Sequence, residues 1–214
     1  IVENPKQEHI YAINWLNEGG NDCSFYLLKI EAIRIGGSEP APLITKIVGP
    51  SEEARQLGQA KKEDAERHKQ RLSFWTELLA ECKRKNFSSF NSISATKDAW
   101  ISATSGIRGL SFVFWVNQFS TRIELRIDRG KGSEEENIEI LNKLKQNKNE
   151  IETEFGGDLM WADLEGYRVC SVRKEFNTGG YRSDEPIIPQ VISETVEAMM
   201  KLEKAVKPFI RQLK

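Results

Sequence analysis

The sequence has few of the residues on which metal sites and most hydrolytic enzymes depend. Its 214 residues include two histidines and three cysteines, and no cysteine belongs to a Cys-x-x-Cys pair. A structural zinc ion needs about four nitrogen or sulfur ligands, usually in closely spaced pairs. We therefore predict no metal and no other cofactor in this chain. We interpret Cys23, Cys82 and Cys170 as reduced thiols of a cytoplasmic protein.

Long apolar runs and an excess of charge of one sign are also lacking. No stretch approaches the roughly 18 apolar residues that a membrane span requires, so we predict no association with a membrane. The 31 lysines and arginines nearly balance the 32 aspartates and glutamates, which argues against a protein that binds polyanions over its whole surface. With 39% hydrophobic residues, the chain is too apolar to be disordered. These values predict a soluble, globular α+β protein.

Catalytic motifs are missing as well. Neither His9 nor His68 lies near a Gly-x-Ser-x-Gly sequence, which argues against a serine or cysteine nucleophile with a histidine base. Asp22 and Glu31 are only faintly similar to the ligands of a metal-dependent nuclease, because Ile33 stands where a lysine is needed. We therefore assign no catalytic residue in this chain.

Residues 1–50 read as a helix followed by two strands. Apolar residues recur at helical spacing up to Glu18, and Asn4 is placed to begin this helix. Residues 24–35 and 43–48 are apolar enough for strands, and a glycine- and proline-rich turn separates them. The chain begins Ile-Val-Glu, which we interpret as the end of a β-strand and hence as a sign that the chain is a fragment.

A charged segment, residues 51–70, connects this part to a second predicted domain, residues 71–214. Both charge signs alternate at helical spacing in the segment, which is compatible with a solvated helix. In the second domain the expected order is helix, two strands, helix, two strands, helix, which makes a compact α+β layer. The expected helices cover 71–86, 133–155 and 187–207, and the expected strands cover 110–117, 121–128, 158–163 and 166–176. Ser133 and Glu136 fit a capping box at the start of the middle helix.

The expected strand 121–128 alternates strictly, with isoleucines and a leucine on one side and charged residues on the other. A positive surface with aromatic platforms is what nucleic acids require. The candidate residues for such a surface are Arg122, Arg126, Arg168, Arg173, Lys174 and Trp100. Glu124, Asp128 and Glu175 alternate with these arginines, so a lattice of cross-strand salt bridges explains the same pattern. Both interpretations stay open.

Four of the five tryptophans are informative about the two sides of this layer. Trp75, Trp115 and Trp161 lie in apolar surroundings and are predicted to belong to the core. Trp100 lies in a polar stretch, residues 87–109, and is the candidate for an exposed platform.

Several stretches resemble a prokaryotic family of uncharacterised proteins. They include Ala-Ile-Asn-Trp-Leu-Asn-Glu at 12–18 and the run from Phe25 to Pro42, which is the strongest of them. Further similar stretches are Phe74-Trp75, Ile151-Glu152, Leu159-Met160-Trp161 and Pro208-Phe209. In that family a restriction-endonuclease-like region of the PD-(D/E)XK type leads into a C-terminal domain of unknown function (family 4268).

The resemblance implies that residues 1–50 complete a nuclease-like fold whose Asp and Glu-x-Lys metal ligands precede Ile1. Any Mg²⁺ belongs to those ligands and not to this chain. No catalytic residue of the family can therefore be placed on this chain. We interpret the chain as the accessory part of a nuclease-associated protein of restriction or phage defence, which engages DNA or positions the missing nuclease-like half. The alternative is a protein–protein or self-association module, for example a homodimer that pairs through the free edge of the strand 24–35.

Overall fold

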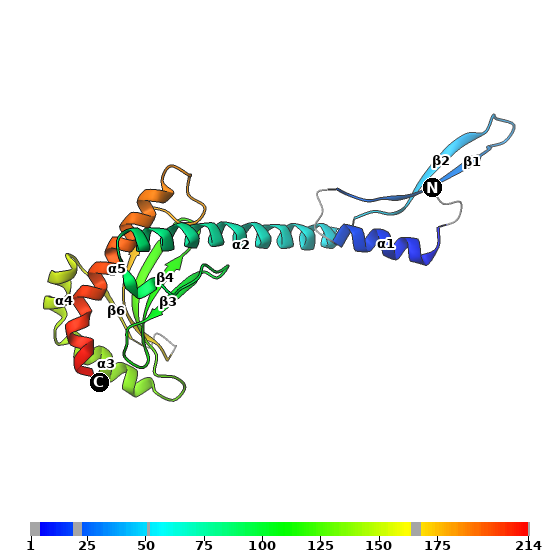
Figure 1. The fold of residues 1–214 in the computed structure, drawn as a ribbon. Coiled ribbons are helices and arrows are strands. Elements are labelled where there is room, and N and C mark those ends of the chain that lie inside the picture. Colours follow the sequence, from blue (N-terminus) through cyan, green and yellow to red (C-terminus); the bar gives the residue numbers. More distant parts are fainter. Residues whose placement is uncertain (1–4, 19–22, 51, 164–167, 214) are drawn as a thin grey trace. The chain divides into compact units, whose positions relative to one another are not determined.

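The computed structural model describes residues 5–18, 23–50, 52–163 and 168–213 (Figure 1). Its helices are α1 (Gln7–Glu18), α2 (Glu52–Arg84), α3 (Glu134–Lys145), α4 (Lys148–Phe155) and α5 (Ile188–Ile210), with short 3-10 turns η1 (Ser88–Phe90) and η2 (Arg211–Leu213). Its strands are β1 (Leu27–Ile33), β2 (Ala41–Val48), β3 (Trp100–Thr104), β4 (Leu110–Val116), β5 (Thr121–Ile127), β6 (Met160–Ala162) and β7 (Cys170–Phe176). The α+β class is thereby confirmed. The chain forms two compact units, which divide between Arg67 and His68.

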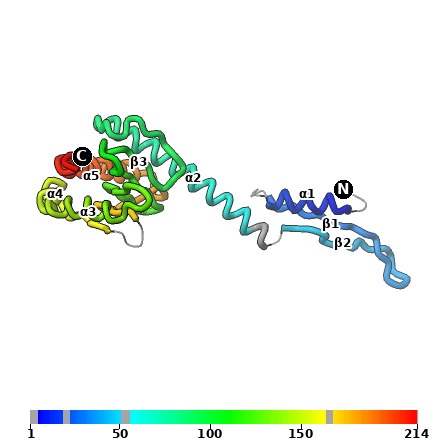
Figure 2. The backbone as a smooth tube through the Cα atoms, turned by 90° about the horizontal axis from the view of Figure 1, so that it is seen from below, coloured from blue at the N-terminus to red at the C-terminus, as the bar shows by residue number. Residues whose placement is uncertain are grey.

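The first unit contains α1, the antiparallel hairpin of β1 and β2, and the part of α2 up to Arg67. Ile10, Ile13 and Leu16 are half-buried on one side of α1, as their spacing predicts. The side chain of Asn17 accepts a hydrogen bond from the Phe25 N–H (2.9 Å) and donates one to the Phe25 carbonyl (3.0 Å). These two bonds hold the chain before β1 against the end of α1. In both views the turn of the hairpin projects beyond α1 (Figures 1 and 2).

The two strands of the hairpin differ in length from the expected ones. β1 is shorter than 24–35, because Phe25 is tied to α1 and the Ser38 N–H already closes a turn on the Ile35 carbonyl (3.3 Å). β2 begins two residues before the expected strand 43–48 and includes Pro42. The expected helix start at Asn4, the ending strand at residues 1–3 and the glycine-rich break after Glu18 lie outside the described residues.

Helix α2 joins the charged segment 51–70 and the helix expected from residue 71 into one element. Ion pairs between neighbouring turns stabilise such a polar helix, as between Arg67 and Asp64 (2.7 Å). The part of α2 in the second unit is amphipathic, and its apolar side is buried from Phe74 onward. Leu72, which the pattern placed on that side, is instead 47% exposed.

The second unit is built on a five-stranded antiparallel sheet with the order β3-β4-β5-β7-β6. Its strand β3 lies inside the polar stretch 87–109, to which the sequence analysis assigns no strand. Only two of its five residues, Ile101 and Ala103, are buried, so the strand carries too little apolar pattern to be recognised by itself. β3 forms because each of its five residues pairs with a residue of β4, beginning with Trp100 opposite Trp115.

The helix expected at 133–155 is interrupted. α3 ends at Lys145, where the Asn147 N–H turns back to the Leu144 carbonyl (3.0 Å), and α4 begins immediately afterwards. Ser133 forms no side-chain cap, so the predicted capping box is wrong. Gly156 ends α4 with a positive φ of 88°, as the glycine rule predicts. The expected hairpin 158–163 and 166–176 is observed as β6 and β7, and its connection at 164–167 lies outside the described residues.

The core lies between one side of this sheet and the helices. In both views α4 and α5 run side by side (Figures 1 and 2). Apolar residues recur along α5 at helical spacing and form a buried stripe, in which five residues are at most 1% exposed: Val191, Val196, Met199, Leu202 and Val206. Facing this stripe, the Thr121 and Thr195 hydroxyls share a buried hydrogen bond (2.9 Å). No described helix is long and apolar enough to cross a membrane.

Candidate interaction site on the open face of the sheet

The residues of the sheet that point away from the buried core form a second surface, here called the open face. Strand alternation determines its members, because Ile123, Leu125 and Ile127 of β5 point into the core and their neighbours point outward. The open face consists of Trp100, Ser102, Thr104, Ser111, Val113, Trp115, Arg122, Glu124, Arg126, Met160, Ala162, Ser171, Arg173 and Glu175.

Two tryptophans lie side by side at one end of the open face. Trp100 and Trp115 are directly opposite each other on β3 and β4, and their ring centroids are 6.1 Å apart. Trp100 is 46% exposed, as expected for a platform. Trp115 is half-buried under the guanidinium of Arg122, which lies 4.6 Å from its ring centroid. The prediction that Trp115 belongs to the core is therefore wrong, because its position on β4 points to the open face.

Arg122 is held on three sides. Besides its contact with Trp115, it is paired with Glu124 on its own strand (3.3 Å) and with Glu175 on β7 (3.5 Å). The side chain of Glu124 is almost completely buried in the middle of the open face. A buried carboxylate needs a compensating cation, so Arg122 stabilises this surface as well as adding charge to it.

Two further arginines converge on Asp128 at the opposite end of β5. Arg168 binds both carboxylate oxygens (2.8 and 3.2 Å), and Arg126 lies 3.5 Å away. The hydrogen bond from Arg168 holds the pKa of Asp128 below its ordinary value, although partial burial opposes this. Arg168 precedes β7 and marks the end of the open face rather than its middle.

The last two basic candidates lie on opposite sides of β7. Arg173 belongs to the open face, where its Nε is 3.2 Å from the sulfur of Met160. Lys174 is aligned with Ile123, whose side chain is in the core, and its Nζ donates to the Asp158 carbonyl (3.0 Å). Neighbouring residues of a strand point to opposite faces, so Lys174 does not share a surface with the arginines.

A cavity of about 530 Å³ opens near Asp128, beside the turn between β3 and β4. Hydroxyl groups of Ser102, Thr104 and Ser111 line it together with the guanidinium groups of Arg108 and Arg126. Sequence reasoning missed these hydroxyl residues because it did not recognise β3. The alternation Trp-x-Ser-x-Thr at 100–104 is the signal that identifies them.

Comparisons with known proteins place this part of the chain in a family. Residues 70–210 match the family described as Domain of unknown function (DUF4268). The chain belongs to the DUF4268 family. No curated protein and no solved structure matches it significantly. The resemblance to a C-terminal domain of unknown function is thereby confirmed, and the DUF4268 domain contains the whole open face.

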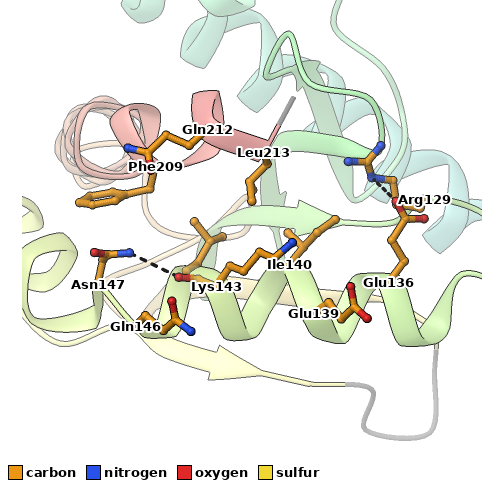
Figure 3. Close-up of a pocket in the computed structure, with 11 residues that line it drawn as sticks. Arg129, Glu136, Glu139, Ile140, Lys143, Gln146, Asn147, Phe209, Gln212 and Leu213 are labelled. Carbon is orange, nitrogen blue, oxygen red and sulfur yellow. Dashed lines mark hydrogen bonds and ion pairs between the residues drawn. The ribbon is translucent and has the colours of Figure 1, made fainter.

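The DUF4268 domain has a second cavity, of about 400 Å³, between α3 and the end of α5 (Figure 3). Its apolar lining consists of Ile140, Leu144, Phe209 and Leu213, and charged residues of both signs and side-chain amides line the rest. Arg129 and Glu136 are paired there (3.4 Å), so part of the charge is already neutralised. This cavity indicates a class of ligand less clearly than the open face does. On the open face, aromatic rings, hydroxyls and arginines lie on a single surface.

The described residues of the DUF4268 domain include no cluster of three or more histidine, cysteine or acidic side chains that could hold a metal ion. Burial raises the pKa of the Cys82 thiol to about 12, so this cysteine is a poor nucleophile. The open face offers stacking, hydrogen bonds and positive charge, which are the means of binding.

Proposed function

We propose that the DUF4268 domain binds DNA on its open face, with unpaired bases stacked on Trp100. The observation that carries the proposal is the half-exposed indole of Trp100 beside the Trp115–Arg122 stack. Exposing so much of an indole is unfavourable unless a flat partner covers it. Bases provide such a partner, and stacking contributes about 1–3 kcal/mol per base without a requirement for sequence.

The arginines determine how the backbone of a single strand would be held. Arg122 is already fixed by Trp115 and two carboxylates, so it orients the aromatic pair. Arg126 makes only a 3.5 Å pair with Asp128, which a phosphate can replace at little cost. Arg173 lies on the same face as Trp100 and supplies a further guanidinium. A few phosphate contacts of this kind agree with a formal net charge of −1.

The test is the fluorescence anisotropy of labelled single-stranded and duplex DNA, titrated with the chain at several salt concentrations. With Arg126 and Arg173 in contact with phosphates, the slope of log K against log salt is expected to be about −1.4 for single strands. Trp100→Ala is expected to weaken binding about 5- to 150-fold, and Trp100→Phe to retain most of it. Flat titrations with both DNA forms at low salt would overturn the proposal.

Two matched pairs of variants test whether DNA binds to the open face. Arg173→Glu is expected to weaken binding strongly, whereas Lys174→Glu, its neighbour on the other side of β7, is expected to change binding little. Leu72→Ala serves as the control for Trp100→Ala, because Leu72 is an equally exposed apolar residue on α2. Equal losses for both members of either pair would mean that general charge or hydrophobicity, not the open face, is responsible.

The second part of the proposal concerns the setting of this domain. We infer from the resemblance of residues 12–18 and 25–42 that the domain directs a nuclease-like half to DNA, in the cytoplasm of a prokaryote. The coding sequence upstream of Ile1 is then expected to contain the Asp and Glu-x-Lys motifs. The protein with those residues should cleave DNA when Mg²⁺ is added, and the present chain should not. An upstream sequence without these motifs would contradict this part and leave DNA binding untouched.

A further inference from the structure

The hairpin of the first unit exposes an unusually apolar side. Leu28 and Ile30 of β1 and Ile44 of β2 lie on one side, and they are 49%, 68% and 61% exposed. A two-stranded hairpin is marginally stable by itself, and sheets usually need three or more strands with an apolar face. The hairpin therefore has the properties of a sheet that needs further strands.

Only one edge of this hairpin is fully able to accept another strand. The outer edge of β2 includes Pro42, which has no N–H to donate. β1 contains no proline from Leu27 to Ile33, and β2 is its only paired neighbour among the described residues. In this part of the chain the outer edge of β1 therefore presents backbone donors and acceptors without a partner strand, which is a template for strand addition.

The charges of β1 indicate what this added strand is. Lys29 and Glu31 point to the side opposite Ile30 and lie 2.6 Å apart, each still partly exposed. If a second β1 pairs antiparallel about Ile30, Lys29 of each chain lies opposite Glu31 of the other. Opposite charges directly across a strand pair are stabilising, and like charges are destabilising.

Other registers of this pairing are unfavourable. A shift by two residues places either Lys29 opposite Lys29 or Glu31 opposite Glu31. A shift by one residue moves the apolar side chains of one copy to the charged side of the other. The register about Ile30 pairs all seven residues of β1 and continues the apolar face across four strands.

We propose that the chain forms a symmetric dimer in which the β1 strands of two copies pair antiparallel about Ile30. The partner is a second copy of this chain, and the interface is independent of the open face and of DNA binding. Seven residue pairs form a small interface compared with those of permanent dimers, so the association is reversible and depends on concentration. Salt weakens it, because the ion pairs at its centre remain partly solvated.

The experiment is sedimentation velocity of the 214-residue chain over a wide range of concentrations, with charge variants at the centre of the strand. Lys29→Glu and Glu31→Lys each bring four like charges together, and each is expected to weaken the dimer more than tenfold. The double variant Lys29→Glu/Glu31→Lys restores the opposite pairing and should dimerise like the wild type. Lys6→Glu, the same charge change outside β1, should have no effect.

Mixing the two single variants gives the decisive result. A chain with two glutamates at these positions complements a chain with two lysines, so the mixture is expected to form a heterodimer although neither variant self-associates. This result also demonstrates that both variants are folded. A wild type that stays monomeric at the highest concentration, or variants that cannot rescue each other, would overturn the proposal. Binding of DNA by the open face would be unaffected by either outcome.

Discussion

The two units of this chain use the same kinds of residue to different effect. In the first unit no residue of α1 is buried, and Trp15 and Ile30 are 73% and 68% exposed. In the second unit Trp75, Phe114 and Ile123 are completely buried. In the second unit four helices cover one side of five strands, whereas the first unit has two strands, α1 and the part of α2 up to Arg67, which are too few elements to enclose a core. The difference teaches that packing within the DUF4268 domain buries its large apolar side chains, whereas the described residues of the first unit leave side chains such as Trp15 and Ile30 exposed.

The largest expected effect concerns the core of the second unit. Phe114 is fully buried in the middle of β4, and its ring centroid is 4.6 Å from that of Phe90. Phe114→Ala is expected to lower the free energy of unfolding by about 3–5 kcal/mol, because it leaves a cavity. Phe119→Ala, at a 63% exposed phenylalanine of the same unit, should change it by less than about 0.5 kcal/mol. Urea unfolding followed by circular dichroism measures both.

A buried amide is expected to contribute the next largest effect. Asn137 on α3 is completely buried, accepts from the Arg129 N–H (3.0 Å) and donates to the Arg168 carbonyl (2.8 Å). Asn137→Ala leaves both backbone groups without a partner, so a loss of about 2–3 kcal/mol is expected in the same urea experiment. Asn147→Ala removes only an exposed bond of 3.4 Å and should cost little. Similar losses of stability for Asn137→Ala and Asn147→Ala would contradict the role of the buried Asn137 amide.

Protonation of Asp128 is expected to have a smaller effect. Its pKa is lowered in the folded state, so the ionised carboxylate stabilises the fold above the unfolded pKa of about 3.9, and this contribution disappears as the pH falls through the folded pKa. Asp128→Asn should therefore cost about 1 kcal/mol near neutral pH, and the difference from wild type should shrink below about pH 4. Unfolding curves between pH 7 and about pH 3 measure this. A difference that grows on acidification would contradict this sign.

The smallest effect is expected in the hairpin, and it tests the comparison most directly. Ile44 is apolar and 61% exposed, so Ile44→Ser should leave the main unfolding transition unchanged at low protein concentration. A marked loss of stability would show that the hairpin is already buried in the single chain. That result would remove the contrast between the two units.

Much of the second unit follows from local patterns. The alternation of β5 and the period of α5 predict correctly which apolar residues are buried in the core, because each element has one clear apolar side. They do not predict that Glu124, on the outward side of β5, is buried as well. β3 and the break between α3 and α4 do not follow from any local period. β3 depends on the partner row of β4, and the break depends on a backbone turn at Asn147.

The candidate site was predictable to a similar extent. Strand alternation identifies Arg122 and Arg126 as outward residues, and the polar surroundings of Trp100 predict its exposure. The sequence does not reveal that Trp115 joins the open face or that Lys174 lies on the other side. Those positions follow from the register of β4 against β3 and of β7 against β5, which residues distant in the sequence determine.

The sequence by itself determined the α+β class, the balance of charge, and the residue types available for binding, because these depend on composition and local period. Only the tertiary structure decided which of those residues share a surface. It placed Trp100, Trp115, Arg122 and Arg173 on one face of four paired strands, and among the described residues it left the side chain of Ile30 68% exposed. The physical reason is that strand pairing joins segments far apart in the chain, and its register decides which side chains meet.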